Sequence, residues 1–272
     1  MTENNIKVKP FLRWAGGKRW LLKDLPRLLP EKSFKNFHEP FLGGGAIFFF
    51  LEPKKKSFLS DLNKELIETY HSVQDDIENV ISDLLSFKNT EEDYYKIRNK
   101  KFVKSSRKAA QFIYLNQTSF NGIYRVNSRG QYNVPYGHRK NYRLDIENLR
   151  LANIALKNCK IAFGDFTDTI KNVNAGDLVF LDPPYTVTHN ENGFVSYNQK
   201  LFSLQDQYRL ANTISEIKEI GAYYILTNAA HEKVREIFNN KDKVIELKRA
   251  SSIGGKNATR GQYSELIITN TI

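Results

Sequence analysis

Seven short runs rich in β-forming residues recur along the 272-residue chain and constrain its fold more than any other feature. Several of them are almost continuously apolar, as strands covered on both faces are, and most are separated by segments with helical periodicity. This alternation predicts an α/β fold with a mostly parallel sheet and helices on each side. The runs cover residues 37–42, 58–61, 160–164, 178–182, 222–227, 243–248 and 265–269, and the last two fit a hairpin at the end of the sheet.

Between the second and third runs, roughly a hundred residues follow a different pattern. Apolar residues recur at helical spacing from Leu66 to Leu84, and Asn63 suits the N-cap of a helix there. Further helical stretches are predicted over residues 91–103 and 106–116. The sheet is therefore expected to be interrupted by a mainly helical insertion.

A hairpin is predicted within this insertion. Residues 123–127 and 131–134 alternate in the manner of strands, and Ser128-Arg129-Gly130 lies between them. The hairpin would carry basic and polar residues at its tip.

Positive charge is concentrated in one part of the insertion. Residues 96–143 contain twelve Lys or Arg and no Asp or Glu, so this segment holds essentially all of the net charge of +11. A field of this kind attracts a polyanion, and eight aromatic side chains in the same segment favour nucleic acid. The competing interpretation is a solvated basic face over a small aromatic core.

Other features bear on compartment and metal content. Cys159 is the single cysteine, and five scattered histidines form no zinc-binding pattern. The segment Met1 to Pro10 is polar, and the longest apolar run, Ala46 to Leu51, is too short to cross a bilayer. We expect a metal-free, cytoplasmic and monomeric protein with no membrane association.

A glycine-rich turn follows the first predicted strand. Residues 39–45 read Glu-Pro-Phe-Leu-Gly-Gly-Gly and precede an apolar helix, so backbone there can approach a ligand closely. Asp61 ends the next strand, at about the distance where an acid in a nucleotide-binding unit reaches the ribose hydroxyls. The alternative is a tight turn and a helix-capping acid.

The sequence Asp182-Pro183-Pro184-Tyr185 ends the apolar strand at 178–181 and thus lies at the edge where open α/β sheets bind ligands. The amino group of a planar base is a poor nucleophile because its lone pair is delocalised into the ring. If Asp182 and the Pro183 carbonyl each accept one N–H, the nitrogen can direct its lone pair at a methyl donor, while Tyr185 offers a stacking face. A rigid strand-end turn without chemistry is the alternative.

Five segments, taken in order, resemble the DNA adenine methyltransferases of the Dam and DpnII-methylase type, the D12 class. They are residues 11–18, 39–45, 60–63, 163–166 and 182–185. The resemblance implies a Rossmann-like S-adenosylmethionine-dependent methyltransferase with a seven-stranded mixed sheet. It implies a catalytic domain at 1–66 and 150–272 and a target-recognition domain at 67–149. Catalytic residues would be Asp182, Pro183 and Tyr185, and the cofactor would contact Trp14, Lys18, Phe41, Gly43, Asp61, Asp165, Phe166 and Asp182.

Residues 116–127 and 132–137 carry a second resemblance to this family, in the segment that reads duplex DNA. It implies guanine contacts for Arg125 and Arg13, and it suggests GATC as the site. Phe120 and Asn121 would fill the gap left by an extruded adenine. Ile123 and Pro135 would contact thymine methyl groups. The family often has Arg where this chain has His138, so Arg139 is the nearest candidate for a DNA contact there.

Several alternatives stay open from the sequence. The amino group could belong to cytosine N4, to adenine in RNA or to a glutamine side chain, although Asp182 as the first motif residue and the insertion favour adenine in DNA. Methylation at C5 of cytosine is disfavoured because it needs a thiolate, and Cys159 lies outside any such motif. A DNA-binding relative without activity conflicts with the intact motifs. The resemblance is compatible with a restriction–modification methylase, a solitary one and a phage enzyme.

Overall fold

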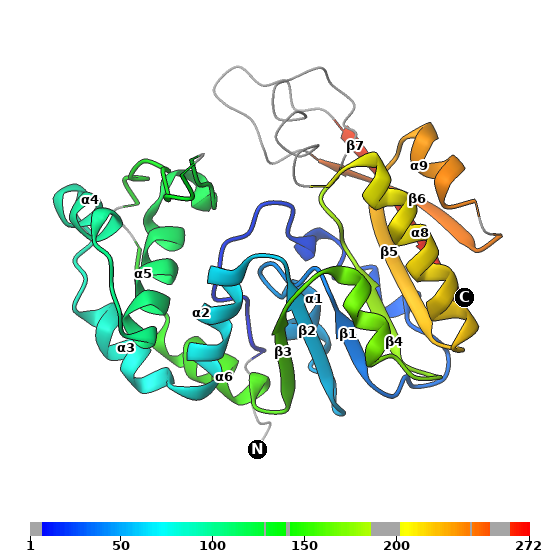
Figure 1. The fold of residues 1–272 in the computed structure, drawn as a ribbon, viewed down its shortest axis with the longest axis horizontal. Coiled ribbons are helices and arrows are strands. Elements are labelled where there is room, and N and C mark those ends of the chain that lie inside the picture. The colour runs from blue at the N-terminus through cyan, green and yellow to red at the C-terminus, as the bar shows by residue number, and fades with distance from the viewer. Residues whose placement is uncertain (1–6, 128, 140–141, 186–201, 240, 251–261) are drawn as a thin grey trace. The chain divides into compact units, whose positions relative to one another are not determined.

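A computed structural model describes residues 7–127, 129–139, 142–185, 202–239, 241–250 and 262–272, so nearly all of the glycine- and serine-rich loop between 250 and 262 lies outside the described residues. In the described part, seven strands form one sheet in the order β3-β2-β1-β4-β5-β7-β6 (Figure 1). Each strand overlaps one of the predicted runs. The strands are β1 Phe37–Glu39, β2 Ser57–Asp61, β3 Cys159–Phe163, β4 Leu178–Leu181, β5 Tyr223–Ala229, β6 Lys243–Ala250 and β7 Gln262–Thr269.

The sheet is mixed, as predicted. Strand β4 pairs in parallel with both β1 and β5, whereas β7 is antiparallel to both β5 and β6. The final strand therefore lies between β5 and β6, so the predicted hairpin forms but only its second strand contacts β5. The order of strands reverses between β1 and β4, which is the kind of switch point where open α/β sheets bind ligands. The Rossmann-like fold class is confirmed.

The described residues pack as two compact units. Unit 1 takes its described residues from Met1–Arg19, Leu42–Lys54 and Leu59–Phe163, and unit 2 takes its described residues from Trp20–Phe41, Lys55–Phe58 and Gly164–Ile272. This grouping follows packing within each unit. The predicted domain division at residues 67 and 149 stays a prediction.

Unit 1 is mainly helical. Its helices are α1 Ala46–Leu51, α2 Lys64–Asp75, α3 Ile77–Leu85, α4 Glu91–Asn99, α5 Ser105–Thr118 and α6 Ile146–Leu156, with a 3-10 turn η3 at Phe120–Gly122. Asn63 caps α2 as predicted, since its side chain accepts the backbone N–H of Leu66. The stretch of helical spacing from Leu66 to Leu84 forms two helices, which meet at Asp76, whose φ of −141° and ψ of 44° are not helical. Both halves pack against α5.

The aromatic side chains of the acid-free segment divide into two groups. Tyr114 is 2% exposed and packs edge-on against Phe87, so it belongs to the core of unit 1. The Arg107 guanidinium lies over the Phe87 and Phe102 rings and forms an ion pair with Asp83. Phe120, by contrast, is 53% exposed. Part of this segment is thus aromatic core with attached cations, and part presents aromatic surface.

Unit 2 contains helices α8 Leu204–Glu219 and α9 Glu232–Ile237 and the 3-10 helices η2 Leu25–Leu28 and η4 Phe166–Lys171, while the 3-10 turn η1 Lys18–Trp20 spans the boundary between the units. Every residue of β4 is at most 1% exposed, which explains its continuous apolar sequence. A capping box of Ser203 and Asp206 begins α8, which packs against β5 (Figure 1).

Within the described ranges, no helix has the length and apolar character needed to cross a membrane.

Candidate functional site

The residues after β1 and β4 share one edge of the sheet. Phe37 is opposite Leu178 and His38 is opposite Val179 in a parallel ladder, so both strands point their carboxyl ends the same way. The segment containing Phe41 follows β1, and Asp182 follows β4. These residues therefore lie at the switch point, on the edge where ligands bind in this class of sheet.

The carboxylate of Asp182 is held by a residue that sequence reasoning missed. Thr227, fully buried in β5, donates its hydroxyl proton to Asp182 Oδ1 over 2.7 Å. A carboxylate has about four acceptor sites, so this bond orients Asp182 without exhausting its capacity to accept. Pro183 is buried and Pro184 is exposed.

Tyr185 is held at its hydroxyl end. The hydroxyl donates to Glu265 Oε2 over 2.5 Å, from a strand that sequence reasoning did not associate with the motif. Burial raises the pKa of Tyr185, and the negative charges of Asp182 and Glu265 raise it further, so the hydroxyl stays protonated and remains a donor. A polar residue directly next to an apolar run was the available signal for both Thr227, which follows Ile225 and Leu226, and Glu265, which precedes Leu266, Ile267 and Ile268.

An aromatic cluster lies beside the same edge in unit 2. The Phe41 and Phe166 rings stack with centroids 5.3 Å apart, and Phe202 contacts both. Asp165 precedes η4 and accepts hydrogen bonds at Oδ1 from Thr167 and from Arg209. Burial raises the pKa of the Asp165 carboxyl, but these hydrogen bonds and the Arg209 charge outweigh it, and the pKa lies below its ordinary value. Phe166 is 5% exposed and the Arg209 guanidinium lies 5.0 Å from its ring centroid, whereas Phe41 is only half-buried, so of these two rings Phe41 presents more surface next to the Asp165 carboxylate.

Unit 1 holds Asp61 against the glycine-rich turn. Asp61 Oδ2 accepts the Gly43 N–H and Oδ1 accepts the Asn63 N–H, each over 2.9 Å. Burial raises the pKa of Asp61, while these backbone donors oppose the rise. Gly43 has a φ of +49°, and a Cβ there would lie 2.7 Å from Trp14 Cδ1, so glycine is required for both conformation and space.

Trp14 and Lys18 are fixed within unit 1. Trp14 stacks on Phe112 and on Tyr124, with ring centroids 6.5 Å and 5.7 Å apart. Lys18 is only 4% exposed, and its ammonium group donates to the Gly16 carbonyl over 3.0 Å. A lysine with this little exposure is unusual for a surface cation, which favours a ligand-binding role over solvation.

The predicted base-replacing residues lie together in the insertion. The backbone N–H of Phe120 donates to the Pro135 carbonyl over 2.9 Å, and Ser119 bridges to Tyr136. Asn121 adopts left-handed backbone, with φ 56° and ψ 6°, and is exposed together with Phe120 and Pro135. Left-handed backbone at a non-glycine residue costs free energy and is found preferentially at functional sites.

Arg125 is tied to the opposite side of the predicted hairpin. Its Nε donates to Asn133 Oδ1 over 2.8 Å and its Nη2 to the Asn133 carbonyl over 3.3 Å. The two segments pair through Asn133 N to Arg125 O and through one bridge between Val126 and Tyr132. Because one side of the guanidinium is used in this way, its Nη1 end remains available for the bidentate contact that guanine O6 and N7 accept.

The other predicted DNA contacts are partly enclosed. The Arg13 backbone pairs with the Asn116 amide, and its side chain lies so close to Gly122 that a Cβ there would be 2.6 Å from Arg13 Nε. Burial lowers the pKa of Arg13, and the charge of Arg139 lowers it further. Arg139 donates to the Gln117 carbonyl over 2.7 Å, so part of its guanidinium serves the protein itself. Ile123 is half-buried next to this group.

Comparison with known proteins places the chain in a family. The sequence model for the D12 class N6 adenine-specific DNA methyltransferases matches residues 14–253. The chain belongs to that class. It is 39% identical to the Type II methyltransferase M.MjaIII of Methanocaldococcus jannaschii, over 97% of this chain and 100% of the relative. It is 36% identical to the Type II methyltransferase M1.LlaDCHI of Lactococcus lactis subsp. cremoris, over 99% and 98%. It is 32% identical to the DNA adenine methylase of Escherichia coli K12, over 96% and 95%.

The resemblance predicted from the five motifs is therefore confirmed, and the protein is an adenine-specific DNA methyltransferase. Membership implies S-adenosylmethionine as the methyl donor and DNA as the substrate. The catalytic, cofactor-binding and DNA-binding roles of individual residues remain predictions. Thr227, Glu265, Arg209 and Asn133 are additions that the structure makes to the predicted set.

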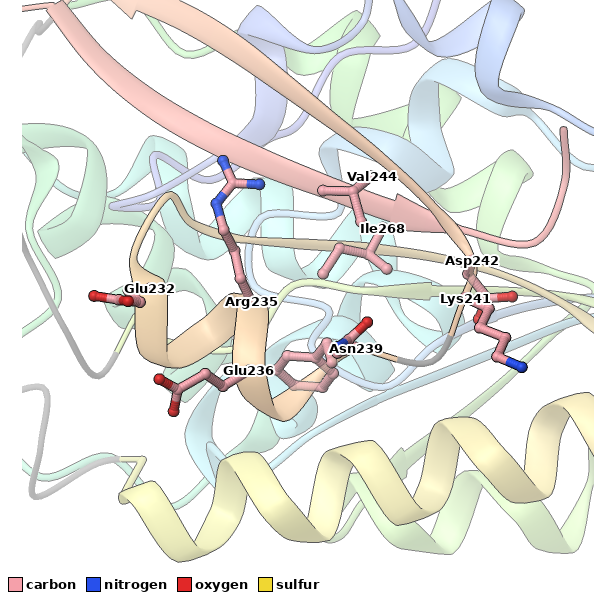
Figure 2. A pocket seen from close by; sticks show the side chains of 9 residues that line it. Glu232, Arg235, Glu236, Asn239, Lys241, Asp242, Val244 and Ile268 are labelled. Carbon is pink, nitrogen blue, oxygen red and sulfur yellow. The ribbon is translucent and has the colours of Figure 1, made fainter.

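The methyltransferase also has a shallow hollow of about 370 Å³ in unit 2 that contains none of the predicted site residues (Figure 2). Glu232, Arg235 and Glu236 reach its rim from α9, while Val244 and Ile268 form part of its floor. Mixed charges around a small apolar floor do not define a ligand class.

Proposed function

We propose that this methyltransferase transfers a methyl group from S-adenosylmethionine to N6 of an adenine flipped out of duplex DNA, within the sequence GATC. One observation carries the chemical part of the proposal. The acid and the aromatic residue of a single strand-end motif, Asp182 and Tyr185, are each held by a buried side chain at the switch point of the sheet.

The motif acts on the adenine amino group. Asp182 and the Pro183 carbonyl each accept one N–H, which pulls the nitrogen away from planarity and directs its lone pair out of the base. Tyr185 supports the base by stacking on one face. Bound S-adenosylmethionine supplies an electrophilic methyl group on a sulfonium. Fixing the orientation of a weak nucleophile in this way is a large source of rate enhancement, and no metal ion has a part in it.

The cofactor-binding roles are proposed residue by residue from the family resemblance. Asp61 would accept the ribose hydroxyls, and Gly43, Trp14 and Lys18 would also contact the cofactor. Phe41 and Phe166 would contact the adenine ring, and Asp165 Oδ2 would accept its amino group, since the bonds from Thr167 and Arg209 go to Oδ1. Asp182 is also proposed to contact the donor.

Base flipping is proposed because a paired adenine cannot present N6 to a protein pocket. Phe120 is the candidate to fill the vacated space, since the residue is 53% exposed. Asn121 is next to it on strained backbone and would face the unpaired thymine. Unstacking costs a few kcal/mol, which stacking of the extruded adenine on Tyr185 partly offsets.

Reading of GATC is proposed from the insertion. Arg125 and Arg13 would each contact a guanine, and Ile123 and Pro135 would contact thymine methyl groups. Arg139 would contact the DNA next to them, with the part of its guanidinium that Gln117 does not use. The protein would act on the duplex as a monomer. Two relatives bear the name Type II methyltransferase, which supports a role in restriction–modification.

Methylation-sensitive digestion tests the sequence specificity. A plasmid treated with the protein and S-adenosylmethionine should resist a nuclease that cuts only unmethylated GATC, and should become sensitive to one that cuts only methylated GATC. A matched set of duplexes with one GATC base pair changed at a time should lose methylation. Equal methylation of every adenine-containing duplex would contradict the proposed specificity.

A further inference from the structure

Glu265 places a carboxylate inside a strand whose next residues are apolar. It is 2% exposed, and Leu266, Ile267 and Ile268 after it are at most 1% exposed. Removing a carboxylate from water is strongly unfavourable unless hydrogen bonds compensate. A leucine would satisfy β7 better if packing were the only requirement at this position.

The Tyr185 hydroxyl is one partner that makes this burial tolerable. The O–H donates to Glu265 Oε2 over 2.5 Å, between residues 80 positions apart in sequence. Charge-assisted bonds of this length are among the stronger ones in proteins. Strand β7 is hydrogen-bonded to β5, with Glu265 opposite Ala229, and β5 also carries Thr227, the donor to Asp182. Neighbouring strands thus anchor both ends of the Asp182–Tyr185 motif.

A bond at the hydroxyl end restrains the orientation of the ring. It fixes the position of the hydroxyl oxygen and therefore χ1, whereas χ2 leaves that oxygen in place because the oxygen lies on the rotation axis. The phenolic O–H prefers to lie in the plane of the ring, so the direction of Glu265 Oε2 also restrains χ2 and favours one orientation of the face presented to a stacked base. Because methyl transfer needs the amino nitrogen in a narrow range of positions, loss of this orientation would slow the chemical step. DNA affinity, which phosphate contacts dominate, would change little.

We propose that Glu265 is a positioning residue for methyl transfer, whose carboxylate orients the Tyr185 ring as the stacking face for the target adenine. The inference rests on the proposed role of Tyr185. It adds a residue on the final strand that contacts neither adenine nor methyl donor.

The test compares Glu265→Leu, Tyr185→Phe and the double variant in single-turnover methylation of a GATC duplex, together with the Kd for that duplex and the Tm. Tyr185→Phe removes only the hydroxyl. Each single variant should lower the single-turnover rate by roughly tenfold to a hundredfold, with Kd nearly unchanged. The double variant should be no slower than the slower single variant, because both changes remove the same bond. Glu265→Gln, whose amide oxygen can still accept the tyrosine O–H, should keep most of the rate.

Comparing Tm with the single-turnover rate distinguishes a positioning role of Glu265 from a purely structural one. Tyr185→Phe leaves a buried carboxylate without this donor and should lower Tm, and the added Glu265→Leu should restore Tm without restoring the rate. Glu246 lies in β6 and is the exposed ion-pair partner of Arg235. Glu246→Leu is the matched control and should leave the rate unchanged. Recovery of the rate along with Tm, or additive losses in the double variant, would overturn the inference while the proposed function stands. Absence of methyl transfer by the wild-type protein would overturn both.

Discussion

The strand-end motif and the segment that is proposed to read DNA are built in opposite ways. Asp182 and Tyr185 are fixed by Thr227 and Glu265, which are at most 2% exposed on neighbouring strands of the sheet. The described residues of 120–135 expose Phe120, Asn121, Arg125 and Pro135 on irregular backbone that single bridges and a few backbone hydrogen bonds hold together. Chemistry on a weak nucleophile requires fixed geometry, whereas a surface that meets DNA benefits from exposed side chains on adaptable backbone. Mutations in the first region should therefore affect rate, and mutations in the second should affect selectivity.

The largest effect is expected for Asp182→Ala. Removing the carboxylate takes away one of two proposed acceptors for the amino group and should lower the methylation rate by at least roughly a hundredfold to a thousandfold. The Kd for duplex DNA should stay near its wild-type value. Asp168→Ala, which removes an exposed acid paired with Lys171, is the control and should be nearly silent. Substantial activity of Asp182→Ala in single-turnover assays would contradict the assignment of Asp182 as a catalytic residue.

The next largest effect is expected for Arg125→Ala, and it concerns selectivity. Loss of a bidentate guanine contact should reduce discrimination at one base pair by about 1–3 kcal/mol, roughly a tenfold to hundredfold change. Asn133→Ala should give a smaller change at the same base pair, because it frees the arginine without removing it. Arg129→Ala, at the exposed hairpin tip, is the control. Equal weakening on all sequences would show that Arg125 contacts phosphate instead.

A smaller effect is expected for Phe120→Ala on a fully paired duplex. Without the ring, the vacated space stays unfilled. The free-energy barrier to methylation should then rise by at most about the few kcal/mol that unstacking costs. A mismatch opposite the target adenine lowers that cost and should restore much of the rate. A loss of the same size on paired and mismatched duplexes would indicate that Phe120 serves packing and not flipping.

The smallest effect is expected for individual lysines of the acid-free segment. Lys101 and Lys104 are exposed, whereas Arg107 is engaged with Asp83 and two aromatic rings. Lys101→Ala or Lys104→Ala should reduce the salt dependence of DNA binding by about one unit of slope for each phosphate that the lysine neutralises in the wild-type complex. Arg107→Ala should lower Tm and leave that slope unchanged. An unchanged slope in both lysine variants together with a lower slope in Arg107→Ala would contradict the assignment of the two lysines to DNA binding and of Arg107 to stability.

The sequence predicted the strands well because each is a local run of β-forming residues, and several of these runs are almost continuously apolar. It did not predict that β7 lies between β5 and β6, since strand order depends on pairing between distant segments. The break at Asp76 was missed because apolar spacing continues across it. Glu265 and Thr227 could have been noticed as polar residues next to apolar runs, but their partners become visible only once β5 is known to pair with both β4 and β7. The roles predicted for the insertion come from family resemblance, because exposed residues carry no periodic signal.

Nucleoside analysis after methyl transfer tests the central claim most directly. Duplex DNA containing GATC is incubated with the protein and methyl-labelled S-adenosylmethionine and then digested to nucleosides. The label should appear in N6-methyladenine, and a matched duplex without GATC should remain unlabelled. Label in N4-methylcytosine, or equal label in both duplexes, would contradict the account.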